Sequence, residues 1–208
     1  MDTALVLMIL SLFWLLGSGS IPSLIRVVGY QGVLLGIMPM LAYGLESEVL
    51  LVGLSGLAVK GLVFPWLMQR ALREARVRRE VEPLVSYNLS LLFGVLALGA
   101  SLVFTAEIPL PSEAPSKLLV PVAFTAVAVG LFLVVARKKA LVQALGYLVF
   151  ENGIYAFGLA VLPHAPLVIE AGILLDALVA VLVMGITLFH INRTFDSLST
   201  ERLVQLKD

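Results

Sequence analysis

Residues 118–136 read LLVPVAFTAVAVGLFLVVA, an apolar run without a single charge that lies between Lys117 and Arg137. With a rise of about 1.5 Å per residue, a helix of this length spans nearly the whole hydrocarbon core of a bilayer. An apolar stretch bounded by charges at both ends is typical of a transmembrane helix. The run therefore predicts an all-α protein that folds in lipid.

Further apolar stretches surround this run on both sides. They cover residues 3–16, 22–44, 49–71, 85–106, 139–161 and 168–191. The first is short, but the Gly-Ser-Gly-Ser sequence at 17–20 favours a turn, and therefore a helical hairpin. One curved helix over the first two stretches is the alternative. We predict a single membrane domain over residues 1–208, a polytopic membrane helix bundle of about seven transmembrane helices.

The composition agrees with a membrane protein and excludes several classes of function. Hydrophobic residues make up 60% of the chain and charged residues 13%, and the mean hydropathy is +1.04. The formal net charge is +0 and the charges lie in short interruptions, so no face is suited to a nucleic-acid backbone. The absence of Cys excludes disulfides, thiolate-bound zinc and iron–sulfur clusters held by this chain.

No catalytic motif is present, and we expect no active site, cofactor or metal in this chain. We find no nucleophile elbow, phosphate-binding loop or pair of catalytic carboxylates in a soluble segment. His164 and His190 have no second His or acid at metal-ligand spacing. Both are predicted to lie at the membrane interface.

The connections between the apolar stretches alternate in charge. The basic connections contain Arg26, the five arginines of 70–79, and 137–139, whereas Glu46 and Glu107 mark the acidic ones. The positive-inside rule then places the N-terminus outside and the C-terminus in the cytoplasm. The chain starts Met-Asp where a signal peptide would be basic, so the first stretch is predicted to be a retained helix.

Two polar segments are predicted to contact partner subunits on the cytoplasmic side. Residues 70–83 are predicted to extend the third helix, and residues after His190 place several apolar side chains along one side of a further helix. A solvated extension and a disordered tail are the alternatives.

Two halves of the chain show a weak internal repeat. The sequence RVVGY at 26–30 is similar to QALGY at 143–147, and the helix after each copy carries one ion, Lys60 or Asp176, at a similar offset. These features predict three-helix modules at 1–83 and 118–208, joined by the predicted helix at 85–106 and its loop, within residues 84–117. Coincidence of two Gly-Tyr pairs is the alternative.

Three ionisable residues are predicted to lie near the middle of the membrane. Lys60, Glu151 and Asp176 each lie about halfway along a predicted helix, so helical rise places them at a common depth. An ionised side chain there costs about 2.5 to 3.5 kcal/mol on insertion scales. This favours a proton or ion pathway over the alternative of a buried ion pair that only holds helices together.

Two further residues of the stretch that contains Glu151 are predicted to belong to this pathway. Tyr155 follows Glu151 by one helical turn, so its hydroxyl could extend a hydrogen-bonded path, with ordinary packing as the alternative. Asn152 lies next to Glu151 and supplies a polar side chain.

Four motifs resemble component E of hydrogenase 4. They are VKGLVFP at 59–65, ARKKALVQALGYLVFENG at 136–153, ILLDA at 173–177 and DSL at 196–198. That family belongs to the formate hydrogenlyase and group 4 nickel–iron hydrogenase complexes. The resemblance implies a non-catalytic subunit of a complex I-like oxidoreductase in a prokaryotic cytoplasmic membrane. It also implies an antiporter-like large subunit and K-, H- and hydrogenase-type subunits as partners.

The last three predicted helices also resemble the K subunit of complex I and the C subunit of Mrp-type antiporters. Gly146 and Asn152 match the first acidic motif of the K subunit, but Glu151 lies three residues after the position of its acid, where this chain has Leu148. Asp176 matches the second acid in position. The departure leaves the path of the proton open.

These observations predict a subunit that contributes to proton or sodium translocation and to assembly of the membrane arm. A free-standing or Mrp-like cation/proton antiporter component is the alternative. A retinal protein is discounted, because the last predicted helix has no Lys for a Schiff base.

Overall fold

A computed structural model describes residues 1–74, 81, 83–108 and 115–161. Within these ranges the chain is helical and forms no named strand. The elements are α1 (Asp2–Gly17), α2 (Ile21–Tyr43), α3 (Ser47–Gly56), the π-helix η1 (Leu57–Val63), α4 (Phe64–Glu74), α5 (Tyr87–Thr105), α6 (Leu119–Ala136) and α7 (Ala140–Val161). The predicted all-α membrane bundle is confirmed.

Five helical spans in the described part are long and apolar enough to cross a membrane, and the shorter α1 is also apolar. One of these spans, Val49–Arg73, comprises most of α3, η1 and α4 joined end to end. Helices satisfy their backbone hydrogen bonds internally, as hydrocarbon requires. The predicted hairpin at the N-terminus is also observed, because α1 and α2 are separate helices joined by a short turn. The predicted helix 168–191 lies outside the described residues.

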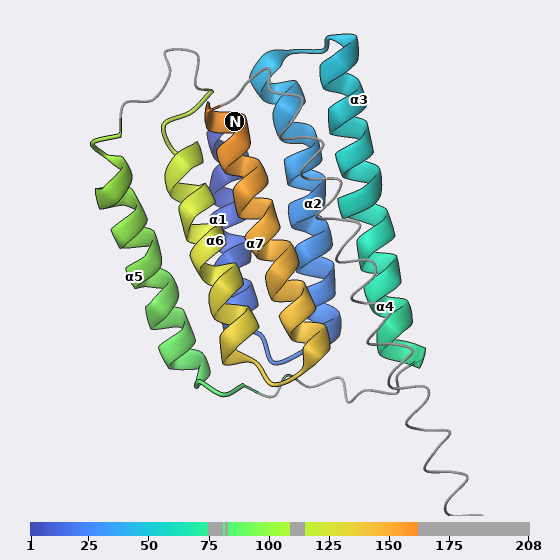
Figure 1. The fold of residues 1–208 in the computed structure, drawn as a ribbon, viewed down its shortest axis with the longest axis vertical. Coiled ribbons are helices and arrows are strands. Elements are labelled where there is room, and N and C mark those ends of the chain that lie inside the picture. The colour runs from blue at the N-terminus through green and yellow to red at the C-terminus, as the bar shows by residue number, and fades with distance from the viewer. Residues whose placement is uncertain (75–80, 82, 109–114, 162–208) are drawn as a thin grey trace, which may run out of the picture.

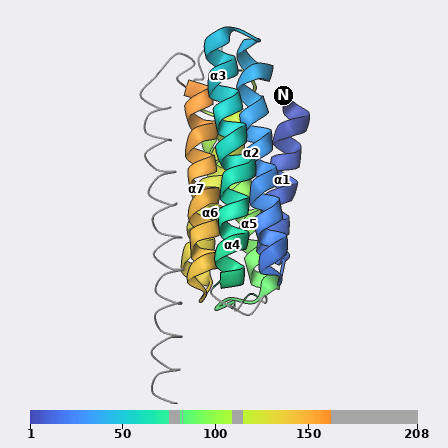
Figure 2. The same ribbon diagram turned by 90° about the vertical axis from the view of Figure 1, so that its right-hand side faces the viewer.

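The spans run side by side, and each span points in the opposite direction to the next one along the chain, with α3, η1 and α4 counted as one span (Figure 1). In that view α5 forms one edge, the joined α3 and α4 form the other, and α7 lies in front of α1. The view turned by 90° places α7 and α1 on opposite sides of the bundle (Figure 2). The spans of α2, α6 and α7 consist mostly of buried residues, whereas α5 and Val49–Arg73 contain few buried residues.

Glycines allow two helix pairs to approach closely. A Cβ atom added at Gly130 of α6 would lie 2.6 Å from the Cα of Phe150 on α7, and one at Gly153 would lie 2.7 Å from the backbone nitrogen of Val127. On α2, a Cβ at Gly32 would lie 2.5 Å from the carbonyl of Lys60. Small residues at helix crossings are typical of membrane bundles, where close van der Waals packing drives association.

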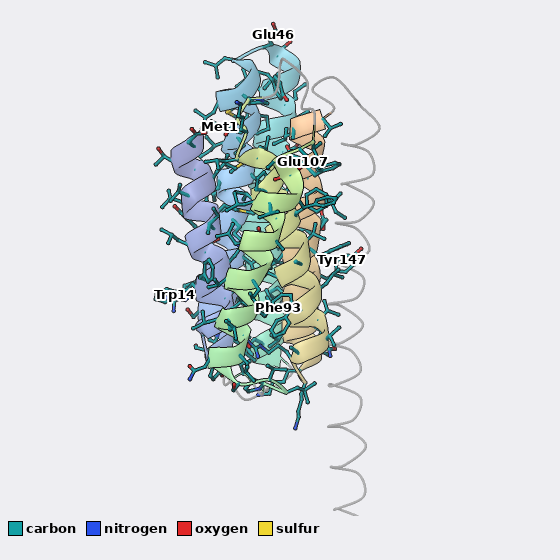
Figure 3. The ribbon with its side chains drawn as sticks, turned by 90° about the vertical axis from the view of Figure 1, so that its left-hand side faces the viewer. Met1, Trp14, Glu46, Phe93, Glu107 and Tyr147 are labelled. Atoms are coloured by element: carbon teal, nitrogen blue, oxygen red, sulfur yellow. The ribbon has the colours of Figure 1, made fainter. Side chains whose placement is uncertain are left out.

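Basic and acidic connections lie at opposite ends of the bundle, as their alternation along the chain predicts. Met1, Glu46 and Glu107 lie at one end (Figure 3). At the other end, backbone hydrogen bonds join the turns, from Val81 to Gly19 and from Leu84 to Ala136. Which end faces the cytoplasm stays a prediction.

We expect residues 45 and 138 to be accessible from opposite sides of the membrane. Both side chains are exposed; Leu45 precedes Glu46 in the turn between α2 and α3, and Lys138 lies in the turn between α6 and α7. Because the chain has no Cys, Leu45→Cys and Lys138→Cys can each be labelled without background. A membrane-impermeant maleimide added to intact cells should label position 45 and should label position 138 only after lysis. Labelling of both positions in intact cells would contradict the predicted topology.

Arg137 is buried, whereas its place in a basic connection suggests a charge exposed in a loop. Its side chain is 1% exposed. The guanidinium donates to the carbonyls of Leu16 and Val85 and to the hydroxyl of Ser90, and it lies 5.5 Å from the centre of the Tyr87 ring. Burial lowers the pKa of Arg137. The residue therefore joins the end of α1, the start of α5 and the end of α6.

Several predicted features lie wholly or partly outside the described residues. They are Asp176, His164, His190, the tail after His190 and half of the 70–83 segment. The division into modules at 1–83, 84–117 and 118–208 stays a prediction. Gly29 and Gly146 are the equivalent glycines of the predicted repeat, and in the described part their contacts differ. Gly29 packs against Pro65 of the span that follows its helix, and Gly146 packs against α6, which precedes its helix.

Candidate functional site

The candidate site is a buried ion pair between Lys60 of η1 and Glu151 of α7. Lys60 is 8% exposed and Glu151 is 2% exposed. The Nζ atom of Lys60 lies 2.5 Å from Oε1 of Glu151 and donates a hydrogen bond to it. The structure thus brings together two of the three ions that were predicted to share a depth in the membrane.

Lys60 lies on a π-helix rather than on a regular α-helical turn. In a π-helix the backbone bonds run from i to i+5, which widens the turn, and such segments are frequent at functional sites. Glycines of α2 lie directly against this segment, with Gly32 at Lys60 and Gly36 at Leu57. The backbone of η1 is therefore packed tightly against α2, and Lys60 extends from it toward α7.

Both partners of the ion pair lie close to the middle of their spans. Lys60 is central in the span Val49–Arg73, and Glu151 is central in α7, Ala140–Val161. An isolated charge at that depth is unfavourable by about 2.5 to 3.5 kcal/mol. Direct contact of opposite charges offsets part of this penalty, so each residue stabilises the ionised form of the other.

Tyr155 lies beside the ion pair, one turn along α7 from Glu151. The Nζ atom of Lys60 is 5.5 Å from the centre of the Tyr155 ring, within the range of a cation–π contact. The Tyr155 hydroxyl is buried and has no hydrogen-bond partner among the described residues. Its O–H group is therefore available to a water molecule or another donor or acceptor.

Asn152 belongs to a second polar contact, on a different side of α7. Its Nδ2 atom donates to Oε1 of Gln31 on α2 at 3.3 Å. The Nε2 atom of Gln31 donates to the hydroxyl of Ser11 on α1 at 2.8 Å, and Ser11 donates to the carbonyl of Met8 at 2.6 Å. We call Asn152, Gln31 and Ser11 the amide file. All three side chains are buried.

The sequence analysis missed Gln31 and Ser11. Gln31 is an amide near the centre of α2, within an otherwise mostly apolar helix, and it is fully buried. An uncharged polar side chain at mid-membrane needs a partner, so its position was the signal that could have identified it.

The remaining predicted pathway residue, Asp176, lies outside the described residues. In the described part, no three His, Cys, Asp or Glu side chains gather as a metal site would require. The chemistry available there is that of one buried acid–base pair with a neighbouring phenol. Such groups can hold, donate and accept protons.

Comparison with known proteins found relatives along most of the chain. An uncharacterized protein of Mycobacterium tuberculosis, Rv0085, is 34% identical over 192 residues, which cover 89% of this chain and 86% of that protein. Hydrogenase-4 component E of Escherichia coli K12 is 28% identical over 176 residues, covering 84% of this chain and 82% of that protein. The same component of Shigella flexneri matches equally well. No family model and no solved structure matched.

Proposed function

Because this chain belongs to the same family as Rv0085 of Mycobacterium tuberculosis and is similar to hydrogenase-4 component E, we propose that it is a subunit of a membrane-bound hydrogenase-type complex. In this proposal the redox chemistry belongs to other subunits, because the chain has no Cys to hold an iron–sulfur cluster. The subunit contributes to the assembly of the membrane arm and to proton translocation.

The buried contact between Lys60 and Glu151 supports the translocation part of the proposal. Two ionisable groups at the middle of the membrane are expensive to bury, and such residues commonly mark ion pathways and proton relays. Packing alone would be served as well by apolar side chains of similar volume. The pair links η1, which belongs to a span with few buried residues, to α7.

The proposed pathway uses the ion pair as a proton-dependent switch. A proton that reaches Glu151 neutralises the carboxylate and releases Lys60 from the pair, whereas loss of that proton restores the contact. The released ammonium of Lys60 can then attract another carboxylate. On this chain the candidate for that carboxylate is Asp176. Tyr155 can extend the path, because its hydroxyl lies buried next to the pair.

The test is replacement of Glu151 by Gln, which keeps the size of the side chain and removes its titratable charge. We expect assembly of the complex and redox turnover to be partly retained, while proton uptake per turnover in sealed vesicles falls about twofold or more, as expected when a relay group is removed. Glu46→Gln is the matched control, because Glu46 is exposed at one end of the bundle.

Two outcomes would contradict the proposal. If Glu151→Gln takes up protons at the parent ratio, the ion pair has only a packing role. If the tagged chain is isolated in mild detergent without any hydrogenase-type subunit, the complex part fails. The free-standing antiporter would then be the function to test.

A further inference from the structure

Gln31 lies on α2, which contacts both elements that carry the ion pair, η1 and α7. Its side chain receives the hydrogen bond of Asn152 on α7. The next residue on α2, Gly32, lies against the backbone of Lys60, where an added Cβ would be 2.5 Å from the carbonyl. One turn of α2 therefore contacts both η1 and α7 at the level of the ion pair.

The two polar contacts of α7 come from adjacent residues. Glu151 and Asn152 project about 100° apart around the helix, since an α-helix has about 3.6 residues per turn. Glu151 contacts η1 and Asn152 contacts α2. Any rotation of α7 about its axis that moved Glu151 away from Lys60 would also break the contact between Asn152 and Gln31.

The amide file is unsuited to carry protons itself. The amides of Asn152 and Gln31 neither gain nor lose a proton near neutral pH. The hydrogen bonds also run in one direction, from Asn152 to Gln31, from Gln31 to Ser11 and from Ser11 to the carbonyl of Met8. The file ends on the backbone of α1. Its geometry is that of an anchor for α7.

We propose that Gln31, held in place by Ser11, is a positioning residue that fixes the rotation of α7 and so keeps Glu151 within hydrogen-bond distance of Lys60. The structural part of this inference stands on the contacts of the amide file, and its consequence for proton translocation rests on the proposed function. This hydrogen-bonded contact adds a directional constraint to the close packing of α7 against α6 at Gly130 and Gly153.

The experiment measures the ionised carboxylate of Glu151 by infrared spectroscopy on the full chain in lipid nanodiscs. The band of Glu151 is assigned by its disappearance in Glu151→Gln. Gln31→Met keeps the length of the side chain and removes both hydrogen bonds. We expect the Glu151 carboxylate band at neutral pH to fall about twofold or more in this variant, since a buried carboxylate that loses its cation becomes neutral.

Two further variants separate positioning from general stability. Ser11→Ala removes only the far anchor and should weaken the band in the same direction by a smaller factor, even if Gln31→Met fails to fold. Thr125→Val is the control, because Thr125 is equally buried but donates only within its own helix, to the carbonyl of Pro121. This control should leave the Glu151 band at the parent intensity.

The positioning role is overturned if both Gln31→Met and Ser11→Ala, or Ser11→Ala alone where Gln31→Met does not fold, retain the parent band. The outcome is independent of the proposed function. If Glu151→Gln leaves proton uptake unchanged while Gln31→Met still weakens the band, translocation through Glu151 fails and the positioning role stands. If Glu151→Gln lowers proton uptake and Gln31→Met weakens the Glu151 band, Gln31→Met should also lower proton uptake per turnover in the assembled complex.

Discussion

Replacing Gly130 by Val is expected to separate α6 from α7 and to destabilise the bundle by about 3 kcal/mol, at the upper end of typical over-packing penalties. A Cβ at this position already lies 2.6 Å from the Cα of Phe150 and 2.7 Å from its Cβ. The backbone of α7 cannot move out of the way as the end of a flexible side chain could. The gain in helix propensity over Gly, about 1 kcal/mol at most, is too small to compensate.

The measurement is unfolding of the full chain in mixed detergent, followed by loss of helical circular dichroism. Gly99→Val on α5 is the matched control, because a Cβ there has no neighbour within 4 Å. Equal unfolding midpoints for the two variants would contradict the close packing of α6 and α7. Since Phe150 precedes Glu151, displacement of α7 should also weaken the ion pair with Lys60.

The boundaries of the spans were predictable because hydropathy is a property of each residue and needs no knowledge of neighbours. The stretch 118–136 is observed as Leu119–Ala136, and 85–106 is observed as Tyr87–Thr105. In lipid, any long apolar segment must satisfy its own backbone and therefore forms a helix. Length and composition are then sufficient to define the element.

The π-helix was not predictable from hydropathy. The stretch 49–71 was interpreted as one regular helix, whereas residues Leu57–Val63 have the wider π pattern. Hydropathy gives the depth of a residue but carries no information on whether its N–H bonds to the fourth or the fifth preceding carbonyl. In the structure the π-helix lies where Gly32 and Gly36 bring the backbone of α2 close to it, a contact between segments that hydropathy does not describe.

Depth also explains which part of the candidate site could be predicted. Counting residues from the helix ends placed Lys60 and Glu151 at the same level, and they are in contact. The direction in which each side chain projects depends on helix rotation, which apolar residues on all sides of a helix leave undetermined. The sequence position of Gln31 marks it as a polar side chain that needs a partner, but the identity of that partner depends on helix rotation. The role of Gln31 becomes visible only when α1, α2 and α7 are placed around it.

Arg137 shows a second limit of sequence patterns. Its place between an apolar run and two lysines is typical of a solvated loop, and the loop charge correctly indicated the basic end of the bundle. At that end the backbone N–H groups of Val81 and Leu84 donate hydrogen bonds to neighbouring turns. The guanidinium of Arg137 is buried and donates to carbonyl oxygens. Burial of this kind depends on contacts between segments far apart in the chain.

Removing one partner of the ion pair is expected to destabilise the protein more than removing both. Lys60→Met leaves the Glu151 carboxyl buried without its cation, for which we expect a loss of about 3 to 5 kcal/mol. Glu151→Met should have an effect of similar size on the buried ammonium. The double variant Lys60→Met with Glu151→Met places two apolar side chains in contact and should be within about 1 kcal/mol of the parent.

This comparison separates the structural role of the pair from its functional one. Unfolding in mixed detergent gives the four stabilities, and Lys138→Met, at an exposed lysine of the basic end, controls for the loss of a positive charge. If the double variant is as unstable as the sum of the single variants, Lys60 and Glu151 do not interact as described. Assembled into the complex, a stable double variant should still support redox turnover while proton uptake per turnover falls, because no titratable group remains at the pair. Retention of the parent proton uptake by this variant would place the proton path elsewhere.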